Sequence, residues 1–132
     1  MAGQVNVYGP TRAFIAGGDI TANRLVKAHS TAGQVVVTTA ITDVVVGVAL
    51  NTVASGGQVE VLVASGFTTK VVASDAVSIG AQLMPTSSGS GKCVTAAGAT
   101  AISCGIALSA SGADGEFIEV QLRPSVKSPA NS

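Results

Sequence analysis

An internal repeat constrains the fold of this chain more than any other feature of its sequence. The segment Gly47–Leu50 (GVAL) returns 58 positions later as Gly105–Leu108 (GIAL). The same shift aligns residues 24–51 with residues 82–109 without a gap and places Leu25 on Leu83. Repeats of this length are typical of one supersecondary unit that is used twice. The repeat therefore predicts a duplicated scaffold.

The composition favours β-structure for the duplicated unit. Apolar residues make up 47% of the chain, aromatic residues only 3%, and there are 16 glycines. Valine and other β-branched residues suit pleated strands, and glycines suit the tight turns between them. No stretch of 11 residues has sustained helical periodicity, although a short helical turn near residues 74–79 is compatible with the sequence. We predict an all-β fold, a compact antiparallel β-barrel or β-sandwich built by duplication of a four-stranded unit.

The first twenty residues lie outside the repeat. They contain apolar side chains without clear periodicity, interrupted by Pro10 and by Gly17–Gly18. Such a segment does not form a core of its own, so we predict an extended N-terminal arm over residues 1–20. This arm is expected to lie on its own domain or on a neighbouring molecule. Its candidate interface residues are Val5, Val7, Tyr8, Arg12, Phe14 and Ile15.

The rest of the chain is predicted to form a single β domain and a tail. The domain covers residues 21–124, with repeat 1 over about residues 24–73 and repeat 2 over about residues 79–122. A flexible tail is expected over residues 125–132. Because valine and alanine bury little area each, the core of a domain this small is thin, and oligomerisation is expected to add burial.

The low charge of the chain excludes some classes of partner. Only 11% of residues are charged, and seven basic residues balance seven acidic ones. A generic phosphate-binding surface needs clustered Lys and Arg, so nucleic acid is not an expected partner. No apolar run approaches the length of a membrane span, and the N-terminus has no secretory signal pattern, so no membrane partner is expected.

The residues that usually carry catalysis do not form a recognisable motif. His29 is the one histidine, in a polar loop segment, and no His, Cys or carboxylate cluster has metal-ligand spacing. Ser87–Lys92 lacks the spacing of a phosphate-binding loop, and there is no G-x-S-x-G nucleophile elbow. Glu60 and Glu119 occupy equivalent repeat positions, which indicates a repeated surface site more than an acid–base pair. The sequence predicts no enzyme, no cofactor and no metal.

The two cysteines leave an alternative open. Cys93 and Cys104 flank a turn region in the second repeat and could face each other across a hairpin. In a protein made in the cytoplasm, two reduced buried thiols are the more ordinary arrangement. The spacing alone does not decide whether they pair.

Several segments together resemble the small head-decoration (capsid cement) proteins of tailed bacteriophages. The similarity extends over about residues 19–124 and is carried by Asp19–Lys27 (DITANRLVK), Gly47–Leu50, Ala54–Val61 (ASGGQVEV), Cys104–Leu108 (CGIAL) and Ile118–Pro124 (IEVQLRP). The resemblance implies a non-enzymatic virion protein, made in the host cytoplasm, on the outer surface of an assembled icosahedral capsid. It further implies bridging of major-capsid subunits, usually as a homotrimer. The alternative is a carbohydrate-binding adhesion module on a virion or cell surface, which shares the Ser/Thr/Gly-rich β character.

Overall fold

The fold consists of β-strands joined by turns and loops. The computed structural model describes residues 11–63, 66–87, 90–97 and 102–127, and over these residues it contains strands and no helix. The predicted all-β class is therefore confirmed. In chain order the strands are β1 (Thr11–Ala16), β2 (Leu25–Ala28), β3 (Gln34–Val37), β4 (Gly47–Ala49), β5 (Gln58–Leu62), β6 (Thr68–Val72), β7 (Gln82–Pro85), β8 (Cys93–Thr95), β9 (Ile102–Ala107) and β10 (Phe117–Lys127).

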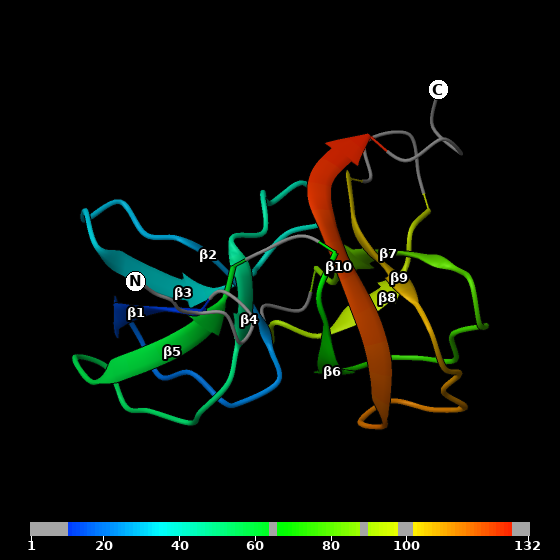
Figure 1. The fold of residues 1–132 in the computed structure, drawn as a ribbon, viewed down its shortest axis with the longest axis horizontal. Helices are drawn as coiled ribbons and strands as arrows, with labels where there is room; N and C mark the ends of the chain where they lie inside the picture. Colours follow the sequence, from blue (N-terminus) through cyan, green and yellow to red (C-terminus); the bar gives the residue numbers. More distant parts are fainter. Residues whose placement is uncertain (1–10, 64–65, 88–89, 98–101, 128–132) are drawn as a thin grey trace, which may run out of the picture.

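The strands form two β units that lie side by side (Figure 1). The first unit is a closed barrel in the order β1-β3-β2-β4-β5, and the second unit is a five-stranded sheet in the order β6-β10-β9-β7-β8. Neighbouring strands within each unit run antiparallel, except that β1 and β3 pair in parallel. The predicted barrel or sandwich thus takes the form of one closed barrel beside a second sheet.

Equivalent hydrogen bonds occur in both units. Ile15 pairs with Gln58 between β1 and β5, and Val72 pairs with Phe117 between β6 and β10. In the next step along the chain, the Ala16 N–H donates to the Gly57 carbonyl at 2.8 Å, as the Ala73 N–H does to the Glu116 carbonyl. Each unit therefore has five strands, and β6 is the first strand of the second unit, not the last strand of the first. The duplication remains a prediction from the sequence, which these equivalent pairings support.

The structural register departs from the gapless alignment of the two repeats. Val26 pairs with Gly47 between β2 and β4, and Leu83 pairs with Gly105 between β7 and β9. The structural counterpart of Leu83 is therefore Val26, and the counterpart of Leu25 is Gln82. The difference arises because seven residues lie between the paired residues Pro85 and Cys93 of β7 and β8, but only six lie between the equivalent pair Ala28 and Val35 of β2 and β3.

Part of the predicted arm and part of the predicted tail belong to the sheets. Residues 11–16 form β1, which pairs with β5 and β3, so an extended arm is wrong for these residues. Residues 125–127 continue β10, which pairs with β9. Residues 1–10 and 128–132, the rest of the predicted arm and tail, lie outside the described residues. The possible helical turn at residues 74–79 contains instead a bridge from Val77 to Ser111.

The two units have separate interiors but share one apolar cluster. The interior of the barrel contains Val26, Val35, Val59 and Val61 with their neighbours. The cluster in the second unit includes, besides its own inward-facing residues, three residues from the first unit: Leu25, Val48 and Leu62. These three are cross-strand neighbours on β2, β4 and β5, and each is 6% exposed or less. Their burial against the second unit joins the two units through the hydrophobic effect.

The glycine that begins the GVAL and GIAL repeats is required by close packing of backbone. A Cβ atom at Gly47 would collide with the carbonyl oxygen of Leu62 on β5. At Gly105 the same atom would lie 2.8 Å from the carbonyl oxygen of Gln121 on β10. The repeat thus preserves a residue without a side chain where two strands approach each other.

Candidate binding surfaces

A contact between the two units, which we call the joint, replaces a barrel-closing bond in the second unit. In the first unit the Ile15 N–H donates to the Gly33 carbonyl at 3.0 Å and helps to close the barrel between β1 and the loop before β3. In the second unit, the Val72 N–H corresponds to the Ile15 N–H, and the Gly91 carbonyl corresponds to the Gly33 carbonyl. The Val72 N–H donates instead to the Asn23 carbonyl at 3.1 Å, and the Gly91 carbonyl accepts from the Leu25 N–H at 2.7 Å. Residues 23–25 of the first unit therefore occupy part of the seam of the second, beside the bridge between Ala73 and Cys93.

Side chains reinforce the joint on both sides of the inserted segment. The Asn23 amide Nδ2 donates to the Lys70 carbonyl at 2.9 Å, and Arg24 Nη1 donates to the Ser90 carbonyl at 2.8 Å. Gly91 is buried with φ +72, and a Cβ atom there would lie 2.9 Å from the Cβ of Arg24. The close approach of backbones leaves little room for movement between the units.

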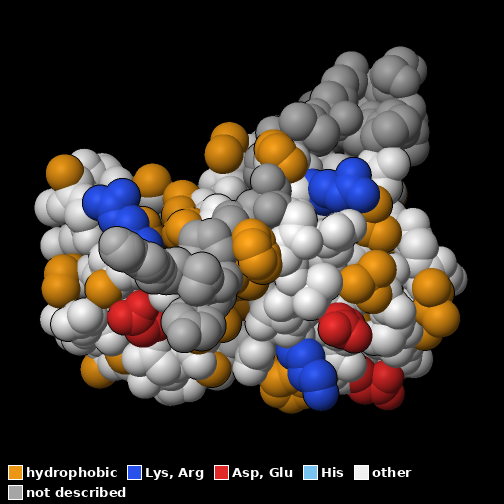
Figure 2. Space-filling view, viewed as in Figure 1, with side chains coloured by type: hydrophobic (Ala, Val, Ile, Leu, Met, Phe, Trp, Pro, Cys, Tyr) orange, Lys and Arg blue, Asp and Glu red, His pale blue; other side chains and the backbone are white. Residues whose placement is uncertain are grey.

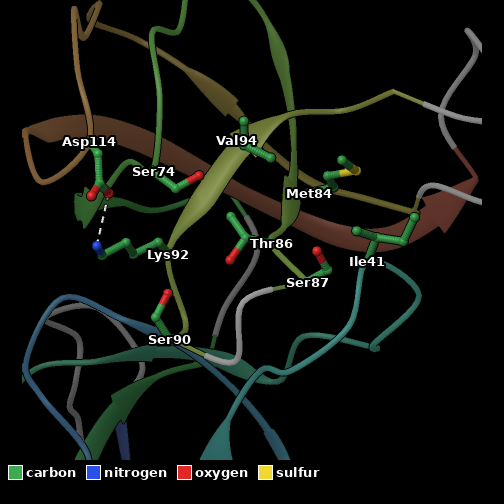
Figure 3. A pocket seen from close by; sticks show the side chains of 9 residues that line it. All are labelled: Ile41, Ser74, Met84, Thr86, Ser87, Ser90, Lys92, Val94 and Asp114. Carbon is green, nitrogen blue, oxygen red and sulfur yellow. Dashed lines mark hydrogen bonds and ion pairs between the residues drawn. The ribbon is translucent and has the colours of Figure 1, made fainter.

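An open hollow of about 600 Å³ lies beside the joint (Figure 3). Lys92 Nζ and Asp114 Oδ1 form an ion pair of 2.8 Å at one side of it, and the Met84 and Val94 side chains line another part. The remaining lining residues are Ile41, Ser74, Thr86, Ser87 and Ser90. The lining holds hydroxyl groups and one ion pair, with no histidine, cysteine or aromatic ring among these described residues. These residues therefore offer no aromatic stacking surface for a sugar ring.

The first unit carries a hollow of about 550 Å³ at the equivalent place. Lys27, His29 and Val36 line it, and their structural counterparts Met84, Thr86 and Val94 line the first hollow. His29 Nδ1 accepts a hydrogen bond of 3.1 Å from the Thr31 N–H, so this nitrogen is used within the loop. The two hollows lie at equivalent positions but are lined by different chemical groups, so their positions follow from the fold and the units do not share one site chemistry.

Asp43 anchors the long loop between β3 and β4. Its Oδ2 accepts from the Thr39 N–H at 2.7 Å and the Ala40 N–H at 2.9 Å, and it lies 3.1 Å from Lys27 Nζ. Burial alone would raise the pKa of Asp43, but the hydrogen bonds from Thr39 and Ala40 and the Lys27 ammonium together lower it below the ordinary 3.8. The carboxylate is thus a structural group that holds the loop.

The predicted interface residues that the structure describes all lie on β1. Arg12 and Phe14 are on one side of this strand, with the Arg12 guanidinium 5.0 Å from the centre of the Phe14 ring. Phe14 packs against the barrel interior, whereas Ile15 is 41% exposed on the opposite side of the strand. Val5, Val7 and Tyr8 lie outside the described residues. Alternate residues of β1 thus have different environments, because successive side chains of a strand point to opposite faces.

Both cysteines are buried free thiols. Cys93 on β8 and Cys104 on β9 lie on either side of β7, and they do not form a disulfide. Burial raises the pKa of each thiol to about 12, and for Cys104 the neighbouring Cys93 contributes in the same direction. Thiols of this kind are core residues, because the reactive thiolate is strongly disfavoured.

The carboxylates do not gather into a site among the described residues. The Glu60 N–H donates to Asn51 Oδ1 at 2.8 Å, and the Glu119 N–H donates to Ser109 Oγ at the same distance. Both glutamates are exposed and belong to different units. Within the described ranges, no group of three or more His, Cys, Asp or Glu residues is placed to hold a metal ion.

Comparison with known families decides what kind of protein has this architecture. A sequence model of a family described as phage cement protein matches residues 9–122, which include β1 to β9 and half of β10. The chain belongs to the phage cement protein family. The resemblance derived from the sequence is thereby confirmed. The cement protein is a structural, virion-associated protein of a phage capsid.

A solved structure agrees with this assignment at the level of the fold. The cement protein is similar to the head fiber gp8.5 N base in bacteriophage phi29, with a TM-score of 0.69 and 17% sequence identity. The similarity covers 90% of this chain and 98% of that chain. At this identity the likeness shows the fold alone. No match is found among curated proteins.

No helix in the described part of the cement protein is long and apolar enough to cross a membrane.

Proposed function

We propose that the cement protein binds the outer surface of an assembled icosahedral phage capsid and stabilises it by bridging major-capsid subunits, as a homotrimer. The observation that carries this proposal is the match to the phage cement family over residues 9–122. The family is described as phage cement protein, and to this description the proposal adds the outer surface, the major capsid protein and the trimer.

The surface of the cement protein suits a broad contact with few charges. Seven basic residues balance seven acidic ones, and Lys, Arg, Asp and Glu side chains are sparse on the face shown in Figure 2. Large apolar side chains are exposed in both units, among them Val44, Ile79 and Phe117. Interface cores are depleted in charged residues, so such a surface is suited to apolar and backbone-mediated contacts. Many identical sites on a shell add modest contacts through avidity.

The N-terminal segment is proposed to contact the capsid or an adjacent subunit. Val5, Val7 and Tyr8 precede β1, and Arg12, Phe14 and Ile15 follow on the strand itself. Removal of residues 1–18 would delete β1 and open the barrel, so it would not separate binding from folding. Removal of residues 1–10 leaves β1 in place and is the appropriate variant.

Binding to purified shells tests the proposal. Shells that lack the cement protein are mixed with the full chain, with the chain without residues 1–10, and with a control chain without residues 128–132. We expect the full chain and the control to sediment with the shells and to raise the temperature at which filled shells release DNA. We expect the chain without residues 1–10 to stay in solution. Equal retention of all three chains would contradict the proposed contact, and no retention of the full chain would contradict the function.

A glycan-binding measurement addresses the alternative function. An adhesion module would bind sugars in the absence of shells, whereas the cement protein is expected to bind none. Among the described residues, the linings of the two equivalent hollows contain no Phe, Tyr or Trp, which favours the capsid role over the sugar-binding role.

A further inference from the structure

The outer edge of β1, at Thr11 and Ala13, lies beyond the end of β3. Strand β3 pairs with β1 only at Ile15 and Ala16, whereas β5 pairs with β1 from Ile15 back to Thr11. The Ile15 N–H points away from β5, since it donates to the Gly33 carbonyl. Backbone groups of alternate residues in an antiparallel strand point the same way. The N–H and C=O groups of Thr11 and Ala13 therefore also point away from β5.

The hydrogen bonds of Glu60 are consistent with this orientation. Glu60 is the residue of β5 directly opposite Ala13. Its carbonyl accepts from the Leu50 N–H and its own N–H donates to Asn51 Oδ1, both at 2.8 Å, so neither group is directed at Ala13. Among the described residues, the N–H and C=O groups of Ala13 therefore have no hydrogen-bond partner, and Ala13 is exposed. Unpaired backbone groups at a strand edge are a template for pairing with another chain.

The second unit shows how the equivalent edge is covered. The residue of β6 that corresponds to Ala13 is Lys70, which lies opposite Glu119 as Ala13 lies opposite Glu60. The Lys70 carbonyl accepts the side-chain hydrogen bond of Asn23. The edge of β6 is therefore covered by a segment of the first unit, whereas no described segment of the chain forms hydrogen bonds with Ala13.

The two edges also differ in charge. In the second unit Lys70 places a cation directly opposite Glu119, and opposite charges across a strand pair are stabilising. In the first unit the small Ala13 takes that position, so the exposed Glu60 has no cation opposite it. A strand added beside β1 would lie about 10 Å from β5, twice the spacing of neighbouring strands. A lysine or arginine on that strand is long enough to extend over Ala13 to the Glu60 carboxylate.

We propose that the outer edge of β1 binds an extended segment of the major capsid protein by β-strand addition, with a Lys or Arg of that segment lying over Ala13 and directed at Glu60. This inference rests on the proposed function and specifies how the capsid is bound. Main-chain hydrogen bonds to Ala13 and Thr11 supply affinity, and the basic side chain selects the segment and its register.

The basic residues of the chain are poorly placed to supply this cation from a second copy. Within the described part of the chain, most of them already interact within their own copy: Arg12, Arg24, Lys27, Lys92 and Arg123. Lys70 lies on the edge that Asn23 covers. A different protein is therefore the better source of a basic extended segment.

The substitution Ala13→Pro tests the edge directly. Proline has no N–H group, and it is tolerated in an edge strand where the N–H points away from the sheet. We expect the variant to unfold cooperatively on heating, as the unchanged chain does. We expect it to bind purified shells that lack the cement protein about tenfold more weakly or worse, because a main-chain hydrogen bond is lost and the added strand is displaced. Co-sedimentation with the shells measures the difference.

The substitution Glu60→Gln tests the charge, and Glu119→Gln is the matched control at the equivalent position of the second unit. We expect Glu60→Gln to weaken shell binding about two- to fivefold, as is typical of one exposed ion pair. We expect Glu119→Gln to leave shell binding unchanged. The difference between the two variants should shrink at high salt, where exposed charges are screened.

Hydrogen exchange identifies the occupant of the edge. The Ala13 amide should exchange freely in the unchanged chain at micromolar concentration and become protected when the chain is bound to shells. The Arg12 amide points toward β5, so it should be protected in both states and serves as the internal control. Protection of Ala13 in solution without shells would show that another copy of the chain covers the edge, and it would contradict a capsid segment.

The inference and the proposed function fail in different ways. Three results would overturn the contact and leave the function standing: shell binding that survives Ala13→Pro, equal effects of the two glutamate substitutions, or an Ala13 amide that exchanges freely on shells. An unchanged chain that does not bind shells would contradict the proposed function together with the contact. If Ala13→Pro does not fold, the glutamate pair and the exchange of the Ala13 amide decide.

Discussion

The side-chain amide of Asn23 donates a hydrogen bond of 2.9 Å to the carbonyl oxygen of Lys70, which lies in the other β unit. Asn23 also accepts the Val72 N–H through its own carbonyl, so one residue satisfies two backbone groups of β6. Its φ is +66, and its counterpart Gly80 has φ +86. Asparagine is among the few residues other than glycine that adopt this conformation readily. The residue thus combines the turn of the first unit with attachment to the second.

Substitution of Asn23 should separate these two roles. Asn23→Gly keeps the backbone conformation but loses the side-chain hydrogen bond, and we expect it to lower the free energy of unfolding by about 1 kcal/mol. Asn23→Ala loses the bond and also strains the backbone, with an expected loss of about 2–3 kcal/mol. Urea denaturation of both variants measures the difference. Equal losses would show that backbone strain at this position is unimportant.

The same comparison can be made between two glycines of the repeat. Gly33→Ala meets open space, so its cost is the conformational strain at φ +80, about 1–2 kcal/mol. Gly91→Ala at φ +72 adds a collision with Arg24 and with the Leu25 carbonyl, and we expect about 1–3 kcal/mol more. Thermal unfolding followed by circular dichroism checks the order. A Gly91 variant as stable as the Gly33 variant would mean that the joint can open without loss.

The contribution of Asp43 to stability should depend on pH. Because the pKa of Asp43 is lower in the folded state than the ordinary 3.8, the folded state favours the carboxylate. Its stabilising effect is therefore fully present above the ordinary pKa and is lost as the pH falls below 3.8 through the folded value. We expect Asp43→Asn to lower the free energy of unfolding by about 1–3 kcal/mol at neutral pH. The two chains should become equally stable in strong acid, and a difference that is independent of pH would contradict this.

The buried cysteines should be inert in the folded protein. With pKa values of about 12, Cys93 and Cys104 are almost entirely protonated at pH 8. A thiol-specific reagent should therefore modify neither before unfolding and both afterwards. A cysteine placed at the exposed Ser87 supplies the matched control, since it should react at once. Rapid modification of the native chain would show that the second unit opens.

The repeat was readable from the sequence because the glycine of GVAL and GIAL is fixed by contacts between strands. The gapless alignment nevertheless placed Leu25 on Leu83, whereas the pairing of β2 with β4 places Val26 there. Matching residue types concealed the extra residue in the loop after β7. The environments explain the error: Leu25 faces the second unit and Leu83 faces the interior of its own, so identical residues are buried for different reasons.

Strand β1 was missed because its partners are far away in the sequence. Its counterpart β6 offered a signal, since Thr11 and Ala16 align with Thr68 and Ala73 at a shift of 57 positions. Four intervening residues differ, which hides the similarity in a single sequence. The joint could not be predicted, because its two backbone hydrogen bonds join groups of Asn23, Leu25, Val72 and Gly91 that every residue except proline has.

The closed seam of the first unit has a consequence for the order in which the protein is made. The bond between Ile15 and Gly33 lies within residues 11–63, so the half that leaves the ribosome first contains every strand that its barrel needs. In the later half, Val72 and Gly91 form hydrogen bonds with Asn23 and Leu25 of the earlier half. Chains generally fold N-terminal units first during synthesis. The barrel of the first unit can therefore be complete when the second unit leaves the ribosome. If the two halves were exchanged in the gene, the second unit would be synthesised before residues 23–25, with which it forms hydrogen bonds.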